Sequence, residues 1–173
     1  MPRQEARDVI LQDAESPVAT KFEQYQILGG ENYKEILIKA PIEEKVPEVI
    51  TDSAGATKYL SSSGKELDVF QSSHWDEPNV ISHLRLNERT YKGKKVTFME
   101  EAQSDWAKAA REKKDTPKHP LVGGGKWVEP TVKRALREAV DNNSDYFAWI
   151  TGEQTSARYN LATQVEKVKW SEY

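Results

Sequence analysis

The sequence predicts an α/β (α+β) fold, with a single mixed, largely antiparallel sheet packed against helices. Three observations predict it. Residues 79–103 alternate polar and apolar side chains over two strands joined by a tight turn at Lys92-Gly93. Residues 127–142 repeat apolar side chains at helical spacing, and the apolar run 146–150 follows. This helix and the strand after it are typical of a crossover unit.

The N-terminal half is expected to contain one strand before the hairpin. Residues 1–20 suggest a short charged helix or a tail, and residues 21–173 a single domain. Residues 32–39 have a strand pattern that Pro41 stops. Residues 41–66 are rich in Pro, Gly and Ser, which indicates a surface insertion with a short helical turn around residues 54–60.

The C-terminal half is expected to alternate helices and strands. Ser104 is a good N-cap for a helix that continues to Lys113, and Pro130 fits the first turn of a second helix. The predicted elements are a loop at 116–125, a helix at 127–142, a buried strand at 146–150, a helix at 153–161 and a last strand at 165–170.

Composition excludes several classes of protein. The chain has 173 residues, enough for one domain with a proper core. Its net charge of −3 makes nucleic acid an unlikely partner. The absence of cysteine excludes disulfides, a thiolate nucleophile and a Cys-ligated zinc. There is no apolar run of membrane-spanning length and no signal-peptide pattern in residues 1–16, so we expect a soluble, cytoplasmic protein without a membrane partner.

The hairpin gathers polar residues on one side. His83 and Arg85 are two residues apart on the first strand, and Glu101, Gln103 and Asp105 are spaced by two at the end of the second. Because side chains alternate across a strand, each set shares a face. This pattern fits a polar site at the mouth of the hairpin, or equally the ordinary exposed face of an antiparallel sheet.

The apolar residues of the hairpin predict its register. Leu84, Leu86, Val96 and Phe98 are expected on one core face, which places His83, Arg85, Glu101 and Gln103 together on the other. This arrangement requires an odd-length loop or a bulge around Gly93.

Each polar residue has a candidate role. Glu101 is a candidate general base, with His83 and Arg85 binding anionic groups and Gln103 and Asp105 binding substrate. An ordinary cross-strand ion pair from Arg85 to Glu101 is the alternative.

His74 is a second candidate base or substrate ligand, while its neighbour Trp75 fills the core. No metal site is predicted, because Glu100 is expected to point away from Glu101. The two remaining carboxylates, Glu101 and Asp105, are too few.

Two strand-to-helix or loop-to-helix junctions add candidates. Gly123, Gly124, Gly125 and Lys126 precede a helix, a pattern that suits phosphate or cofactor binding but also an ordinary flexible loop. At the second junction Thr151 and Arg158 are candidate substrate ligands, and Tyr159 is a candidate acid or a core aromatic.

Five phrases of the sequence resemble an uncharacterised domain of phages and prophages. They are NYKEILIKAP, SSHWDEPNVISHLRLNER, FMEEAQSDW, WVEPTVKRALREAV and YFAWITGEQTSARYNLATQVEKVKW, in this order within residues 22–170. That domain is typically embedded in very large, multidomain phage proteins, the polyvalent proteins. The resemblance implies a viral setting, in the bacterial host cytoplasm or the virion, but no activity.

A second resemblance is to the GNAT acetyltransferase fold, in which strands lead into a glycine-rich loop, a helix, a strand and a helix that supplies a tyrosine acid. It implies acetyl-CoA as cofactor, the glycines at 123–125 and Lys126 as its binding loop, and Tyr159 as the acid. The sequence departs from that family at Pro120, where the loop wants Gln or Arg, and through the extra helix from Ser104.

The leading hypothesis is therefore a phage-associated α/β domain with a polar site on its central hairpin, acting as a GNAT-like group-transfer enzyme on a small molecule. Two alternatives stay open. One is a non-catalytic module that binds a host or phage protein, such as a defence inhibitor or virion component. The other is a metal-dependent hydrolase that uses Glu101 and Asp105.

Overall fold

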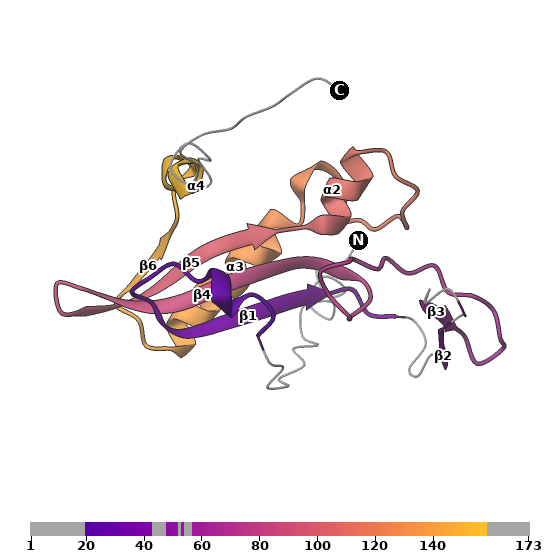
Figure 1. The fold of residues 1–173 in the computed structure, drawn as a ribbon, viewed down its shortest axis with the longest axis horizontal. Helices are drawn as coiled ribbons and strands as arrows, with labels where there is room; N and C mark the ends of the chain where they lie inside the picture. The colour runs from indigo at the N-terminus through magenta and orange to yellow at the C-terminus, as the bar shows by residue number, and fades with distance from the viewer. Residues whose placement is uncertain (1–19, 43–47, 52, 54–56, 159–173) are drawn as a thin grey trace, which may run out of the picture.

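The computed structural model describes residues 20–42, 48–51, 53 and 57–158 and has the predicted α+β architecture (Figure 1). Its strands are β1 (Glu31–Lys39), β2 (Glu48–Thr51), β3 (Thr57–Leu60), β4 (Val80–Tyr91), β5 (Lys94–Gln103) and β6 (Tyr146–Trp149). Its helices are α2 (Asp105–Arg111), α3 (Val128–Asp141) and α4 (Gly152–Arg158), with 3-10 turns η1 (Glu23–Tyr25) and η2 (Gly123–Gly125). None of the helices in the described ranges is long and apolar enough to cross a membrane.

The main sheet has the strand order β1-β4-β5-β6. β1, β4 and β5 are antiparallel, whereas β6 runs parallel to β5. The chain reaches β6 through α3, so the predicted crossover unit is confirmed. β6 lies at the edge of the sheet, with Tyr146 and Trp149 52% and 60% exposed, so the prediction of a buried strand is wrong.

The insertion at 41–66 contains a strand pair instead of the predicted helical turn. β2 and β3 form a separate two-stranded antiparallel sheet in which Val49 pairs with Tyr59. Tyr59 is buried, which ties the pair to the rest of the chain. Residues 54–56, residues 1–19 of the predicted tail or helix at 1–20, and the predicted last strand at 165–170 lie outside the described residues.

The central hairpin turns at Lys92-Gly93 and has its irregularity elsewhere. Both turn residues have positive φ (50° and 74°), as a two-residue turn matching the strand twist requires. The register shifts farther along, because Arg85 pairs with Glu101 whereas the next residue of β4 pairs with Met99. Glu100 is therefore the extra residue of a β-bulge. The prediction of an odd-length loop or a bulge around Gly93 is wrong, because Tyr91 pairs with Lys94 across a two-residue turn.

The bulge moves two apolar residues to the opposite face from the one predicted. Val96 pairs with Arg89, and the Arg89 guanidinium lies 4.7 Å from the centre of the Phe98 ring. Val96 and Phe98 thus share the face of Arg89, away from Leu84 and Leu86. The prediction of one four-residue core face is wrong, because it assumed an uninterrupted alternation along β5.

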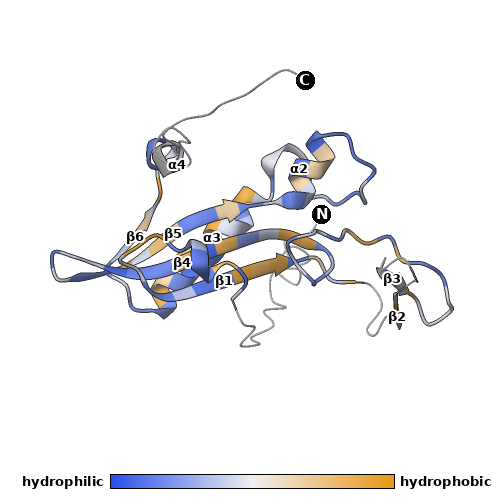
Figure 2. Ribbon diagram, viewed as in Figure 1, coloured by the Kyte–Doolittle hydropathy of each residue, from blue (hydrophilic) through white to orange (hydrophobic). Residues whose placement is uncertain are grey.

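Two apolar clusters hold the layers together. Leu84 and Leu86 pack against Ala135 of α3, which covers one face of the sheet. The second cluster lies at the other end of β4, where Ile81 and Trp106 are buried with Phe70 and Val122. Figure 2 shows this distribution of hydropathy: the tip of the hairpin is hydrophilic, and hydrophobic residues lie at the far end of β1 and β4. Trp106 and the N-cap Ser104, whose Oγ accepts a hydrogen bond from Ala107, fix α2 at that end.

A segment that we call the strap, residues 20–30 with η1, crosses the sheet face that α3 leaves open (Figure 1). The backbone amides of Lys21 and Phe22 donate to the carboxylate of Glu35, at 2.9 and 2.6 Å. The strap is therefore held through its main chain by an acidic residue of β1.

A second carboxylate, Glu100, holds the middle of the strap. Its Oε1 accepts hydrogen bonds from the amide of Ile27 at 2.8 Å and from Asn87 Nδ2 at 2.6 Å. Arg89 lies 3.5 Å from the same oxygen and donates to the carbonyls of Ile27 and Leu28. Glu100 thus lies on the same side of the sheet as Glu101, the side that the strap covers. The prediction that it points away from Glu101 is wrong, because the bulge interrupts the alternation of side chains.

Candidate functional site

Three pairs of polar residues line the strap side of the sheet where β5 ends and α2 begins. We call this row the polar ladder. Its pairs are Arg85–Glu101, His83–Gln103 and His74–Asp105. Since the first two pairs are register partners, their four side chains lie on one face, as the alternation predicts. The bulge at Glu100 shifts the register of β5 by one residue, which places Glu101 opposite Arg85 and Gln103 opposite His83.

The first pair is a largely buried ion pair. Arg85 Nε lies 2.5 Å from Glu101 Oε2, with the two side chains 5% and 29% exposed. Burial opposes the charge of Arg85, but the nearby charge of Glu101 and the contact with the Tyr33 hydroxyl outweigh it and raise the pKa of Arg85 above its ordinary value. The cross-strand ion pair considered from the sequence is therefore present, and it occupies one oxygen of the candidate base Glu101.

The second pair contains a buried, neutral histidine. His83 Nδ1 accepts a hydrogen bond from Trp75 Nε1 at 3.3 Å, and the two rings lie 5.0 Å apart. Accepting at Nδ1 requires the neutral tautomer with its proton on Nε2. Burial lowers the pKa of His83, and the charges of Glu101 and Asp105 oppose this only in part. The predicted role of binding anionic groups needs a cationic ring, which this environment disfavours.

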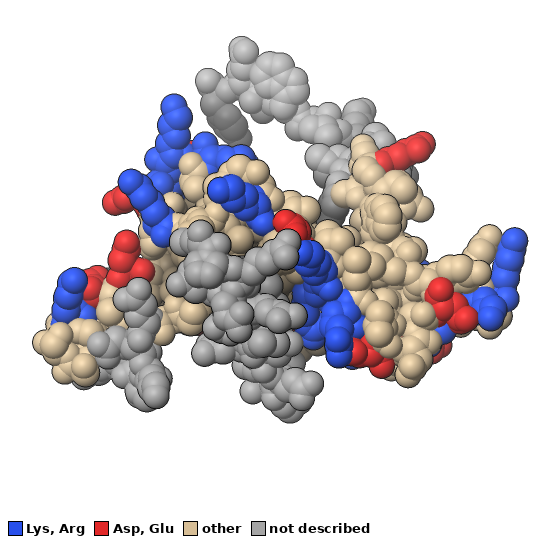
Figure 3. Space-filling view, turned by 180° about the vertical axis from the view of Figure 1, so that it is seen from behind, with Lys and Arg blue, Asp and Glu red and all other residues tan. Residues whose placement is uncertain are grey.

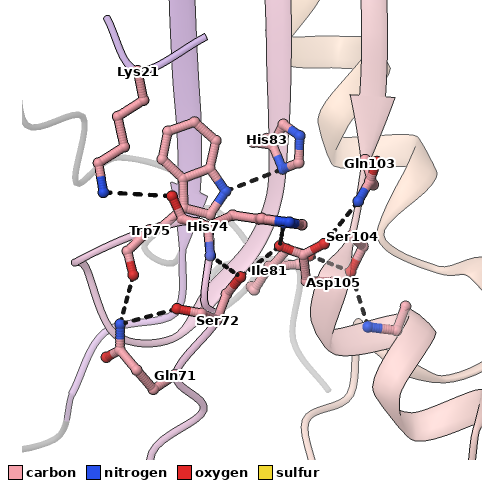
Figure 4. A network of polar contacts seen from close by, with 11 residues as sticks. Lys21, Gln71, Ser72, His74, Trp75, Ile81, His83, Gln103, Ser104 and Asp105 are labelled. Atoms are coloured by element: carbon pink, nitrogen blue, oxygen red, sulfur yellow. Dashed lines mark hydrogen bonds and ion pairs between the residues drawn. The ribbon is translucent and has the colours of Figure 1, made fainter. Parts of the chain in front are cut away.

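The third pair is organised around the carboxylate of Asp105 (Figure 4). Oδ2 accepts from Ser72 Oγ at 2.6 Å and lies 2.9 Å from His74 Nδ1, and Oδ1 accepts from Gln103 Nε2 at 2.7 Å. Burial raises the pKa of Asp105. The hydrogen bonds from Ser72, Gln103 and His74 lower it by a larger amount, so the pKa of Asp105 lies below its ordinary value. Asp105 is thus a fixed acceptor that joins the second and third pairs.

His74 is the most accessible ring of the ladder. Its side chain is 49% exposed, and its backbone amide donates to Ser72 Oγ at 3.0 Å. Asp105 holds Nδ1, while Nε2 makes no hydrogen bond to the part of the chain that the structure describes. An imidazole oriented through one nitrogen and open at the other is the usual arrangement of a general base. Trp75, by contrast, is buried, as predicted.

A cavity of about 330 Å³ opens next to the first pair, where β5 and β6 part. The parallel pairing of the two strands extends to Met99 and Trp149. Beyond it, Arg85 and Glu101 line one side of the cavity, and Trp149, Ile150 and Thr155 line the other. The carboxyl edge of adjoining parallel strands is a common position for ligands. The cavity combines a charged wall with an aromatic one.

The turn after β6 does not join the ladder. Thr151 Oγ1 accepts from the amide of Gln154 at 3.2 Å, and Gln154 Oε1 accepts from the amide of Thr151 at 2.9 Å. This reciprocal pair is a capping box, so Thr151 serves to begin α4. Arg158 is the last residue of α4, and the structure describes its backbone but not its side chain. Tyr159 lies outside the described residues.

The candidate cofactor loop is exposed and open. Gly124 and Gly125 have positive φ, 64° and 73°, which favours glycine, and no atom lies within 4 Å of the position of an added Cβ on Gly123, Gly124 or Gly125. Lys126 is exposed beside them. This backbone is accessible to an anion, although the described contacts do not connect it with the ladder.

Sequence reasoning found most of the ladder and missed Ser72. A hydroxyl two residues before His74 is a weak signal, because the pattern does not show that Asp105 comes to it from another element. Within the described ranges, no three His, Asp or Glu side chains are grouped so that they could hold a metal. Comparisons of the chain with protein-family models, with curated proteins and with solved structures gave no match.

Proposed function

We propose that the chain is a group-transfer enzyme that binds its substrate in the cavity between β5 and β6 and removes a proton with His74. One observation carries this proposal: Arg85 and Glu101 belong both to the cavity wall and to the polar ladder. Asp105 lies four positions after Glu101 along an extended backbone, about 13 Å at the rise of a strand. A substrate that extends along the ladder from the cavity therefore reaches the His74–Asp105 pair.

The proposal assigns the base role to His74 and a positioning role to Glu101. Glu101 already shares one oxygen with the Arg85 cation, whereas His74 has an oriented ring with a free nitrogen. The neutral His83, with its proton on Nε2, is a hydrogen-bond donor on the same face. Tyr159 remains the candidate acid.

Acyl transfer is the specific reaction that we propose. Three antiparallel strands, a crossover helix, a parallel strand and a further helix follow one another in the order on which the GNAT resemblance rests. Acetyl-CoA would supply the activated acyl group, with the exposed main chain at 123–125 facing its phosphates, part of its arm in the cavity and its acyl end at the His74–Asp105 pair, within reach of the base. Pro120 and α2 are the departures from that family, and they make the cofactor the first point to test.

Thermal unfolding with a panel of ligands tests the binding step. Acetyl-CoA, free coenzyme A, nucleotides and magnesium or manganese ions are compared. A ligand at 100 times its Kd adds about 2.7 kcal/mol, which raises the Tm by about 5–10 °C in a domain of this size. Glu101→Gln should abolish the shift, whereas Glu66→Gln, an exposed carboxylate paired with Lys58, should keep it. A panel without any shift would contradict the proposed function.

Release of the coenzyme A thiol tests the chemical step. The chain has no cysteine, so a colorimetric thiol reagent has no background from the protein. With a panel of small amines as acceptors, His74→Gln should lose at least 100-fold in rate through the loss of general base catalysis. It should keep the ligand-induced Tm shift, because His74 does not line the cavity. A full rate in this variant would remove His74 from the base role.

A binding module for a host or phage protein is the second candidate, and a specific observation favours it. Large apolar side chains are exposed along α3 and the edge strand β6, namely Leu136, Val140, Tyr146 and Trp149. A contiguous exposed apolar patch marks an interaction surface, and we propose that these four side chains form one. The phage setting implied by the sequence phrases belongs to this proposal as well. An unresponsive ligand panel, together with loss of phage fitness in a Val140→Asp variant that folds normally, would favour this candidate over the enzyme.

A further inference from the structure

We propose that the segment from α2 to η2 is a binding surface for the phosphodiester backbone of nucleic acid. We call residues 108–126 the basic cap. Its six cations are Lys108, Arg111, Lys113, Lys114, Lys118 and Lys126, against two carboxylates, Glu112 and Asp115. The cap therefore has a charge of +4, whereas the rest of the chain, with 19 cations and 26 carboxylates, has −7. Because exposed charges act over about 8–10 Å at physiological salt, this local charge decides what approaches the cap.

The fold presents these cations outward from an anchored base. Trp106 is buried, stacks on Phe70 at 5.1 Å and donates from Nε1 to the carbonyl of Pro117 at 3.0 Å. Val122 is buried in the same cluster, so both ends of the loop after α2 are fixed on the protein. The loop thus carries its basic residues on a defined surface. Figure 3 shows Lys and Arg side chains gathered over this end of the molecule, at the upper left.

Most of these cations have no acidic partner. All six are exposed. Within the described part of the chain, only Lys114 of the six forms an ion pair, with Glu112 at 2.7 Å. Lys114, Lys108 and Arg111 together lower the pKa of Glu112, so three cations surround this one carboxylate. A surface that served only to stay solvated would more commonly intersperse the two signs.

The glycines at 123–125 favour a phosphate ligand over a carboxylate protein surface. Their backbone is exposed, and nothing lies within 4 Å of their missing side chains, so a tetrahedral anion can approach the main chain beside the Lys126 side chain. The cap has one aromatic ring, His119, which is partly buried against Trp106. Binding should therefore depend on phosphates, without base stacking and without sequence preference.

Fluorescence anisotropy of a fluorescein-labelled 20-base-pair DNA duplex tests this surface with the full chain. At 50 mM NaCl we expect a Kd of about 10 μM that weakens steeply towards 200 mM, as binding through phosphates does. Two variants carry the same total charge change. Lys118→Glu with Lys126→Glu alters the cap, and Lys65→Glu with Lys92→Glu alters exposed lysines elsewhere.

The two variants give opposite expectations. The cap variant should weaken binding at least tenfold and reduce the slope of log K against log salt by about 2, one for each lost phosphate contact. The control variant should change the Kd less than threefold. Absence of binding at 50 mM NaCl, or equal weakening in both variants, would overturn the proposal. Circular dichroism melts of both variants test that folding is kept. The Glu101→Gln variant, which lies outside the cap, should bind the duplex like the wild type, so the two proposals are tested separately.

Discussion

Asp105→Asn is the sharpest test of the polar ladder, because it keeps the shape of the side chain and removes its charge. In the wild type, the carboxylate accepts from Ser72 at 2.6 Å and from Gln103 at 2.7 Å, besides its contact with the half-exposed His74. A hydrogen bond to a charged group contributes about 1.5–3 kcal/mol and a neutral one about 0.5–1.5. Two such bonds weakened by about 1 kcal/mol each give a loss of about 2 kcal/mol, and the exposed His74 contact adds little.

This loss corresponds to a decrease in Tm of about 4–8 °C for a domain of this size. Asp115→Asn is the matched control, since it makes the same chemical change at an exposed carboxylate of the loop after α2. It should shift the Tm by less than 1 °C. Thermal melts of the three proteins at pH 7 measure the difference. Equal losses in both variants would show that the Asp105 hydrogen bonds do not stabilise the fold.

The pH dependence of the Asp105→Asn effect gives a second check. The pKa of Asp105 is lower in the folded protein than its ordinary value, so its carboxylate adds stability above the unfolded pKa of about 3.9. That stability is lost as the pH falls through the lower folded pKa. The gap in unfolding free energy between wild type and variant should therefore be constant from pH 7 to 5 and shrink below pH 4. A gap that does not change down to pH 3 would refute the assigned shift.

Two further variants test the strap and the second pair of the ladder. Gly30→Ala should destabilise by about 2–4 kcal/mol in urea titration, because an added Cβ would overlap the buried amide of Asn87. Gly123→Ala, in open space at ordinary φ, should be nearly neutral. For His83 the folded pKa is depressed, so stability should be full above the unfolded pKa of about 6.5 and fall as the pH drops below it. His83→Gln should flatten the change in unfolding free energy between pH 7.5 and 5, and an unchanged slope would contradict a neutral, buried His83.

The sequence predicts the fold class and the strands of the ladder because local patterns determine both. Period-2 alternation locates β4 and β5, and Lys92-Gly93 marks their turn. The predicted sheet face is correct for His83, Arg85, Glu101 and Gln103. It is wrong for Val96 and Phe98, which lie on the opposite face from Leu84 and Leu86. Both outcomes have one cause, the bulge at Glu100. Nothing in the residues around Glu100 signals a bulge, because the glycine that often marks one is absent.

Contacts between distant segments account for what the sequence could not supply. Ser72 and Asp105 meet through the packing of the loop before β4 on the start of α2. The cavity depends on where β6 leaves β5, and the exposure of Trp149 depends on β6 being the edge strand. An apolar run alone cannot distinguish a central strand from an edge strand, because burial follows from the order of strands in the sheet.

The hydrogen bonds that hold the strap come from its main chain, so its path does not depend on the identity of the side chains at those positions. Glu35 and Glu100 bind the main-chain amides of Lys21, Phe22 and Ile27, which every residue except proline possesses. Homologous or engineered chains can therefore exchange the strap's exposed side chains and alter what borders the ladder while the covering loop keeps its path. Proline at any of these three positions would remove an anchoring donor. The two acceptors and Gly30 are thus the fixed part of this cover, and the exposed side chains of the strap are the part free to diverge.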